Sequence, residues 1–210
     1  MTAIPLLNDW LIERAEHHRF VPRWRGLRLV AADASTMRFG LRASHVKRAA
    51  LADQILVGLF LPGCELMLAA SLHSVHDNER QMLFEHLDRL SGRDLLLLDR
   101  GYPARWLVAA LSQRGIAFCM RVEKSGNSGF ACVRDFLRSG LLEQVVTLRA
   151  ADRRDVVDFE CPSVPQTVRL VRHIAPNGQV RVLMTNLFDV VCFPAGSFAD
   201  LPQSVRINHA

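Results

Sequence analysis

Apolar positions along this chain follow two different periods, and the alternation between them predicts a fold that mixes strands and helices. Two apolar runs, 51–61 and 64–73, flank a Pro-Gly turn and predict a hairpin of two strands. The following segment changes to helical spacing, so a helix is expected over 78–90, with Asp77 as its N-cap.

The stretch DLLLLDRGYPARWLVAAL, residues 94–111, predicts a buried strand followed by a helix over 103–114. Four consecutive leucines are typical of a strand that is buried on both faces of a sheet. Asp99 follows them directly, at the carboxyl end of the strand, where α/β sheets bind their ligands. Asp99 is therefore either a functional carboxylate or an ordinary turn residue, and this stretch leaves both interpretations open.

A second apolar run, LRLVAADAST at residues 27–36, also ends near a carboxylate, Asp33. If this strand and the strand at 94–98 lie side by side and parallel, Asp33 and Asp99 emerge at the same edge of the sheet. Two such acids can share divalent metal ions about 3.5–4 Å apart, the arrangement that serves phosphoryl transfer.

The pattern changes after a further strand expected over 116–122. Residues 131–139 predict a short helix, and four β-rich runs follow it: QVVTLR, DVVDFEC, QTVRLVRHI and QVRVLMTNL. An Asn-Gly pair between the last two runs is a strong hairpin signal. Segment 124–180 is therefore expected to be a small, mostly antiparallel insertion, with the charged residues 152–155 at a hairpin turn.

Composition narrows the class of protein. Half of the 210 residues are hydrophobic, which supports one well-buried domain, and the formal charge of +5 with a pI near 9.3 favours a polyanionic partner. Five scattered cysteines form no Cys-x-x-Cys motif, which is typical of reduced thiols in the cytoplasm. The N-terminus lacks the pattern of a signal peptide, and Pro and Gly interrupt the longest apolar stretch, so no membrane partner is expected.

Three blocks, RWRGLRLVAADAST, LLLLDRGYPARWLVAALSQRGIAFCMRV and VLMTNLFD, resemble DDE transposases of the insertion sequence 4 family over about residues 20–200. The resemblance implies an α/β fold, an RNase H-like mixed sheet flanked by helices, with a β-rich insertion. It matches Asp33 to the first acidic residue of the catalytic triad and Asp99 to the second. In the family these acids hold two Mg2+ ions, for which Mn2+ can substitute, and the ions activate water to cut DNA and then the freed 3′ hydroxyl to join it to target DNA.

The resemblance also implies double-stranded DNA as partner, both transposon ends and target, and allows a homodimer in the synaptic complex. Arg100 and Tyr102 are expected near the DNA backbone because they follow the second acid. Two basic patches are further DNA-binding candidates, Arg23 with Arg25 and Lys47 with Arg48. A solvated basic face, with Trp24 packed in the core, explains the first patch equally well.

Two departures from the family pattern are visible. Ala34 follows the first acid where the family usually has Gly. The family's third carboxylate is a Glu on a late helix, but here FPAGSFADL is followed by PQSVRINHA, and no Glu follows Glu160. A frameshift or truncation near codon 202 is expected to have removed the helix with the third acid, which would leave the enzyme defective.

The expected organisation has five parts: an N-terminal segment (1–26) with a helix near 8–19, the catalytic core (27–123), the insertion (124–180), a return to the core (181–201) and an aberrant tail (202–210). The expected function is DNA transposition by metal-dependent strand cleavage and transfer, in a prokaryotic, cytoplasmic, nucleoid-associated protein. The alternative is a non-catalytic DNA-binding or oligomerising fragment that modulates intact transposase.

Overall fold

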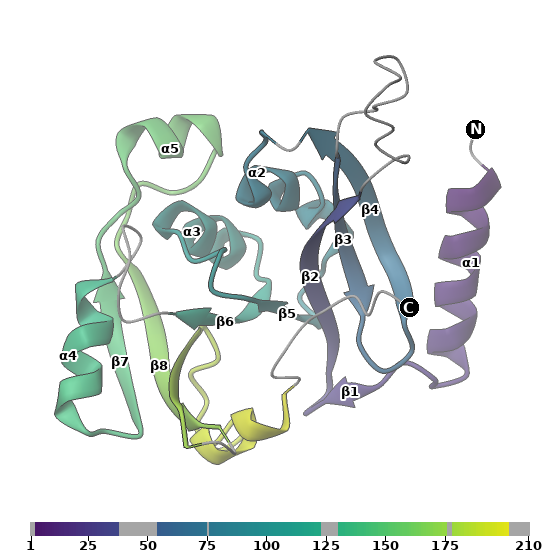
Figure 1. Cartoon of the computed structure of the whole chain (residues 1–210). Helices are drawn as coiled ribbons and strands as arrows, with labels where there is room; N and C mark the ends of the chain where they lie inside the picture. Colours follow the sequence, from purple (N-terminus) through teal and green to yellow (C-terminus); the bar gives the residue numbers. More distant parts are fainter. Residues whose placement is uncertain (1–2, 38–53, 75, 123–129, 176–177, 202–210) are drawn as a thin grey trace, which may run out of the picture.

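The computed structural model describes residues 3–37, 54–74, 76–122, 130–175 and 178–201 (Figure 1). Its strands are β1 (Arg23–Trp24), β2 (Leu27–Met37), β3 (Gln54–Leu61), β4 (Leu66–Ser74), β5 (Asp94–Leu98), β6 (Ala117–Val122), β7 (Glu143–Leu148), β8 (Gln166–Ile174) and β9 (Val180–Thr185). Its helices are α1 (Ala3–His17), α2 (Glu79–Phe84), α3 (Arg105–Gln113), α4 (Ala131–Ser139) and α5 (Arg153–Asp158), with the 3-10 turns η1 (Leu87–Arg89) and η2 (Ala195–Asp200).

The strands form one large mixed sheet flanked by helices. Its order is β4-β3-β2-β5-β6-β9-β8-β7, and the short β1 pairs with β2. At the centre, β5 runs parallel to both β2 and β6, whereas β3, β4, β9, β8 and β7 pair antiparallel with their neighbours. The strands of segment 124–180 therefore continue the central sheet through β9 instead of forming a sheet of their own.

Alternate side chains of the central strands enter two separate cores. Val30, Leu96 and Leu98 belong to a large cluster that includes buried residues of α1, α2, α3 and α4. Leu29 and Leu95 belong to a smaller cluster on the other face, which contains Trp24 and residues of the chain around η2. All five residues of β5 are buried, which confirms the prediction of a strand buried on both faces.

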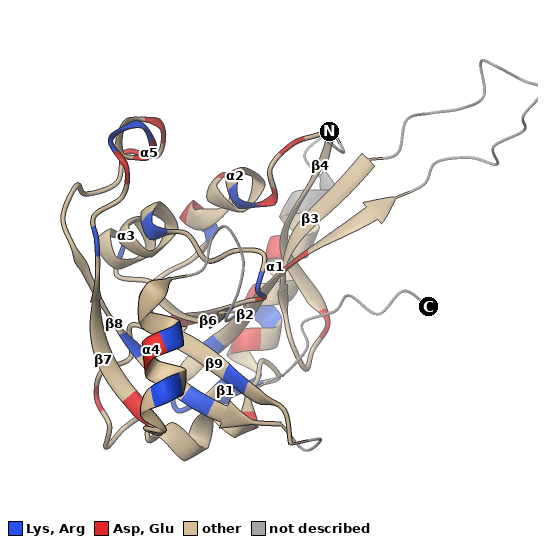
Figure 2. Ribbon diagram, turned by 60° about the vertical axis from the view of Figure 1, so that its left-hand side comes forward, with Lys and Arg blue, Asp and Glu red and all other residues tan. Residues whose placement is uncertain are grey.

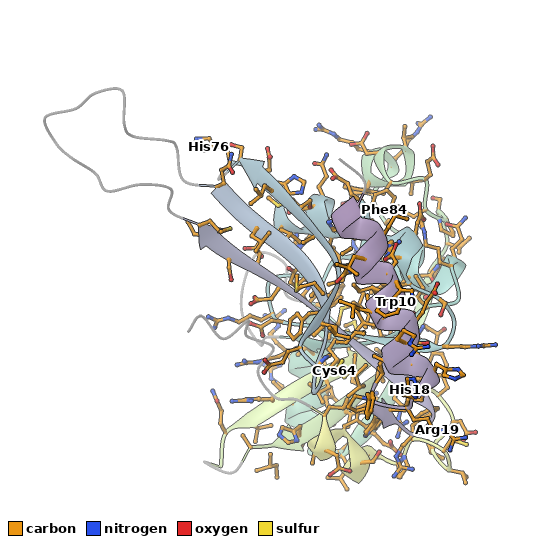
Figure 3. All side chains as sticks on the ribbon, turned by 90° about the vertical axis from the view of Figure 1, so that its right-hand side faces the viewer. Trp10, His18, Arg19, Cys64, His76 and Phe84 are labelled. Carbon is orange, nitrogen blue, oxygen red and sulfur yellow. The ribbon has the colours of Figure 1, made fainter. Side chains whose placement is uncertain are left out.

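The hairpin around Pro62-Gly63, the strands at 94–98 and 116–122 and the helix at 131–139 are confirmed within a residue or two, and residues 51–53 of the first expected strand lie outside the described residues. The N-terminal helix begins earlier than expected, at Ala3, and lies beside β4, where Asn8 Nδ2 donates to the Met67 carbonyl at 2.7 Å. Figure 3 views the molecule from this side, with Trp10 on the helix. No helix in the described ranges is long and apolar enough to cross a membrane.

The expected helix over 78–90 is shorter and begins differently. Asn78 is the N-cap, since its side chain accepts a hydrogen bond from the Arg80 amide at 3.0 Å. Asp77, expected to be the cap, instead accepts from the Ser74 amide at 3.0 Å and closes the turn after β4. The helix ends at Phe84, and a 3-10 turn around Leu87 completes the buried stripe.

The run DVVDFEC was expected to be β-rich, and this prediction is wrong. It forms α5, so the charged residues 152–155 begin a helix and do not lie at a hairpin turn. The reason is the pairing around it: β7 and β8 pair directly with one another, and the segment that connects them leaves the sheet. Arg154 and Asp158 then form an ion pair one helical turn apart, at 3.4 Å.

Candidate functional site

The two candidate catalytic aspartates emerge at one edge of the central sheet. The parallel pairing of β2 with β5 ends at Ala31 opposite Leu97, and Asp33 and Asp99 each lie two residues further along. Neighbouring strands are about 4.8 Å apart, so the two acids lie at the same level, Asp33 within β2 opposite Gly58 of β3, and Asp99 directly after β5. The sequence prediction required this parallel arrangement, and the structure has it.

The two aspartates differ in their local contacts. Asp33 is half-buried, and its Oδ1 accepts a hydrogen bond from the Ala34 amide at 2.9 Å. Asp99 is exposed over 54% of its side chain, and its Oδ1 lies 3.7 Å from Arg121 Nη1 on β6. The amide of Tyr102 donates to the Asp99 carbonyl at 3.2 Å, which closes the turn after β5.

A third carboxylate, Glu79, belongs to this edge and was missed by sequence reasoning. Glu79 is the first residue of α2, and a Cβ atom placed on Gly101 would lie 3.4 Å from Glu79 Oε2. Burial raises the pKa of Glu79, and the negative charges of Asp33 and Asp99 raise it further. Acids are common in the first turn of helices for reasons of the helix dipole alone, so residue type carried no signal of a site.

The start of α2 is held against the turn after β5. The Asn78 cap fixes the first turn, and Arg80 Nε donates to the Gly101 carbonyl at 2.9 Å. Glu79 lies between these two anchors, so its carboxylate is directed over the turn that carries Asp99. We refer to Asp33, Glu79 and Asp99 as the acidic site.

Tyr102 differs from its expected position near the DNA backbone. Its ring joins the large core cluster with Trp106, and the residue is only 3% exposed. Its buried hydroxyl has no hydrogen-bond partner among the described residues. Burial raises the pKa of Tyr102, as do the charges of Glu79, Asp33 and Asp99.

The basic candidates are distributed over different parts of the molecule. Arg100 is exposed on the turn beside Asp99, whereas Arg23 and Arg25 lie at the start of β2. From Leu27 to Asp33 the strand covers about 20 Å, so this patch lies away from the acidic site. Lys47 and Arg48 are outside the described residues.

The β1–β2 hairpin explains the residues of the first patch. Arg25 and Gly26 both have positive φ, 49° and 86°, as a two-residue hairpin turn of type I′ requires. Arg25 Nη1 donates to the Cys192 carbonyl at 2.8 Å. Trp24 is buried and stacks on Phe193, with ring centroids 5.6 Å apart, which confirms the interpretation of Trp24 as a core residue.

An open cleft of about 840 Å³ begins next to the acidic site. Asn78 and Pro103, the neighbours of Glu79 and Tyr102 in sequence, line it, and it continues between α3, α4, α5 and β7. Figure 2 shows basic residues on α2, α3 and α5, the helices around it. We call it the arginine cleft, because its lining holds four arginines against two aspartates: Arg80, Arg105, Arg149, Arg154, Asp155 and Asp158.

The acidic site has the donor chemistry that magnesium prefers, namely carboxylate oxygens. Within the described residues, no three His, Cys, Asp or Glu side chains lie close enough together to hold a metal ion. The acidic residues nevertheless share one electrostatic environment, since Asp33 and Asp99 both act on the pKa values of Glu79 and Tyr102.

Comparisons with known proteins assign no family. No family model matches the chain, and no curated protein matches it. Among solved structures, the chain is similar to Ciona intestinalis endonuclease V, a D234N variant in complex with a 23mer DNA. That likeness has 10% sequence identity and a TM-score of 0.32, and it covers 86% of this chain and 82% of the other. At this identity and TM-score it carries no argument about function.

Proposed function

We propose that this chain has an RNase H-like core and carries out metal-dependent cleavage and transfer of DNA strands, as DDE transposases do. The observation that carries the proposal is the register of β2 and β5, which brings Asp33 and Asp99 to one edge of the sheet. The order of elements supports it, since three strands, a helix, a strand, a helix and a strand follow one another as the resemblance requires.

Asp33 and Asp99 would hold Mg2+ through their carboxylate oxygens. Bound there, the metal supplies positioning of the attacking oxygen and stabilisation of the charge that develops at phosphorus. Asp99 is exposed, so its carboxylate is accessible to a phosphodiester.

A nicking assay tests this function. Supercoiled plasmid incubated with the purified chain and Mg2+ or Mn2+ should be nicked, and a chelator should stop the reaction. Asp33→Asn and Asp99→Asn should each lower the rate about 10³-fold, since loss of a metal ligand removes several kcal/mol of transition-state stabilisation. Asp88→Asn is the matched control, because Asp88 is an exposed acid on η1, outside the acidic site.

Two results would contradict the proposal. Absence of metal-dependent nicking by the wild-type chain would remove the catalytic function. Nicking that persists in both Asp33→Asn and Asp99→Asn would show that it comes from other residues or from a contaminant.

The arginine cleft favours a second function, a non-catalytic DNA-binding protein that modulates intact transposase. An open cleft with four arginines suits a phosphate backbone, and the net charge of +5 acts in the same direction. Arg105 pairs with Asp152 at 2.8 Å and Arg154 with Asp158 at 3.4 Å, and the side chains of Arg149 and Arg154 are exposed.

Duplex binding at several salt concentrations tests the cleft. The double variant Arg149→Glu/Arg154→Glu should bind duplex DNA about tenfold or more weakly and should lower the salt slope by about 1–2. Arg134→Glu/Arg138→Glu on α4 is the control of equal charge change, because both arginines are exposed and do not line the cleft. Equal losses of DNA affinity in the cleft variant and in the control would mean that binding depends on net charge and not on the cleft.

A further inference from the structure

Ser71 on β4 forms hydrogen bonds with two histidines at once. Its Oγ lies 2.5 Å from His73 Nε2 on the same strand and 2.7 Å from His86 Nε2, in the turn between α2 and η1. All three residues are partly buried. We call Ser71, His73 and His86 the imidazole clamp, because their contact ties the end of α2 to the sheet.

The clamp needs at least one neutral imidazole. A serine hydroxyl carries one proton, so it donates to only one of the two rings, and that ring must have an unprotonated Nε2. The other ring donates its own Nε2–H to the Ser71 oxygen, and it can do so whether it is neutral or charged. If both rings are protonated, the hydroxyl has no acceptor left, and two positive charges face each other across one oxygen atom.

The charged groups around the clamp do not remove this repulsion. Glu85 Oε2 lies 3.9 Å from His73 Nε2, but the Glu85 side chain is 54% exposed. Arg89 adds a positive charge near His86 and is itself paired with Asp9 of α1. The neighbouring strand β3 has no titratable side chain. Burial lowers the pKa of His86 from its usual 6.5, and the opposing charge of Glu85 does not reverse this.

We propose that the imidazole clamp is a pH-sensitive contact, which holds the end of α2 on β4 at neutral pH and opens in mild acid, when both histidines are protonated. At its other end, α2 is anchored by Arg80, whose Nε donates to the Gly101 carbonyl in the turn after Asp99. The clamp therefore fixes the helix that borders both the acidic site and the arginine cleft. Its pH response does not depend on the proposed function, because it concerns only how α2 is held.

The direction of the pH dependence follows from linkage. His86 binds its proton less readily in the folded state than in the unfolded state, because its folded pKa is lowered from 6.5. The stability that the clamp contributes is therefore fully present above pH 6.5, and it is lost as the pH falls through the lowered pKa.

Urea unfolding of the full chain between about pH 7.5 and pH 5 tests the clamp, since histidine changes its charge in this range. The unfolding equilibrium constant of wild type should rise severalfold more over this range than that of His86→Gln or His73→Gln. Either substitution should be sufficient, because a clamp with one remaining histidine accepts its proton without repulsion. His76→Gln is the control and should respond to pH as wild type does, because His76 is exposed in the turn after β4 and lies outside the clamp (Figure 3).

The two variants also separate the clamp from simple burial of one histidine. If His73→Gln keeps the pH dependence of wild type and only His86→Gln loses it, burial of His86 is the cause and the clamp is wrong. If both variants respond to pH as wild type does, neither histidine is part of a pH-sensitive contact. The comparison uses the change with pH within each protein, so a variant that is less stable at every pH still gives a clear result.

Hydrogen exchange locates the effect in the structure. The amides of Glu85 and His86 donate to the Gln81 and Leu83 carbonyls at the end of α2. Their protection factors should fall in mild acid in wild type and stay unchanged in His73→Gln, while the amides of β5 stay protected in both. Loss of protection that is equal in α2 and β5 would mean that acid unfolds the whole domain and does not open the clamp.

Discussion

The paired strands β2 and β5 carry acidic residues at both ends, and the two ends differ in how the charge is balanced. At the amino end, Asp94 lies opposite Arg28 in the register, with bonds of 2.5 and 2.9 Å from the guanidinium. Ser91 donates to Asp94 from its amide at 2.8 Å and from its hydroxyl at 3.1 Å. Glu16 adds a second carboxylate to Arg28, and the Asp94 side chain is completely buried.

At the carboxyl end the negative charges have no arginine as close as Arg28 is to Asp94. Asp99 is about half exposed, Arg121 approaches it only to 3.7 Å, and the acids raise the pKa of Glu79. At the amino end the acids favour the charged state of their neighbour instead: burial lowers the pKa of Arg28, but the hydrogen bonds and charges of Asp94 and Glu16 outweigh this and leave it raised. Aspartates five residues apart in sequence thus serve different purposes, Asp94 for stability and Asp99 for an accessible negative site.

Asp94→Asn should lower the free energy of unfolding strongly, because it acts at the amino end of the pair. It leaves the half-buried Arg28 guanidinium with Glu16 as its remaining counter-charge, and loss of one partner of a buried pair costs up to about 3–5 kcal/mol. Urea unfolding followed by circular dichroism measures the loss. Asp99→Asn is the matched substitution at the other end of the same strand, and its stability should lie within about 0.5 kcal/mol of wild type. Equal losses for both would abolish the distinction between the two ends.

Divalent metal should have the next largest effect on the free energy of unfolding, and it should act only through the residues at the carboxyl end. A ligand that binds the folded state alone stabilises it by about 2.7 kcal/mol at one hundred times its dissociation constant. Mn2+ at that excess should therefore stabilise wild type and Asp88→Asn but not Asp99→Asn. Stabilisation of Asp99→Asn to the same extent would place the metal elsewhere.

Sequence reasoning succeeded where the information was local in the chain. The leucine run and the small apolar residues before Asp33 sufficed to predict two buried strands with acids at their carboxyl ends. It failed where the partner was distant: Arg28 and Asp94 are 66 residues apart, and nothing in either segment indicates the other. Glu79 was missed for a related reason, because its role depends on how α2 is anchored to Gly101 across 21 residues from Arg80.

Two of the errors, on DVVDFEC and on Tyr102, have the same origin. Two valines beside acidic residues in DVVDFEC are compatible with a strand, but direct pairing of β7 with β8 leaves the segment no place in the sheet. Tyr102 carries both a polar and an apolar group, and only the packing against α3 determines that the ring is buried.

Arg121 and Arg28, one at each end of the β2–β5 pair, allow the two ends to be compared from the side of the positive charge. Arg121→Gln removes an ion pair that is partly exposed at 3.7 Å, so the free energy of unfolding should fall by less than about 1 kcal/mol. Arg28→Gln leaves Asp94 buried and without its guanidinium, so it should cost about 3–5 kcal/mol. Chemical denaturation of the two variants in one buffer gives both values. A larger loss for Arg121→Gln than for Arg28→Gln would mean that the carboxyl end is built for stability after all.

The smallest expected effect is the dependence of stability on pH that Glu79 introduces. Its folded pKa is raised above the ordinary value of 4.5, so the folded state binds more protons than the unfolded state just above that pH. Stability should therefore fall as pH rises from the ordinary pKa through the raised pKa, and the penalty is fully present above the raised pKa. With a chelator present, Glu79→Gln should be at least as stable as wild type at pH 7, and this advantage should disappear below the ordinary pKa, where both side chains are neutral. Urea midpoints of wild type and Glu79→Gln, measured across this pH range with Glu85→Gln as control, show which of the two proteins is more stable at each pH. A Glu79→Gln variant that is less stable at pH 7 would show that the charge of Glu79 supports the helix and does not oppose its neighbours.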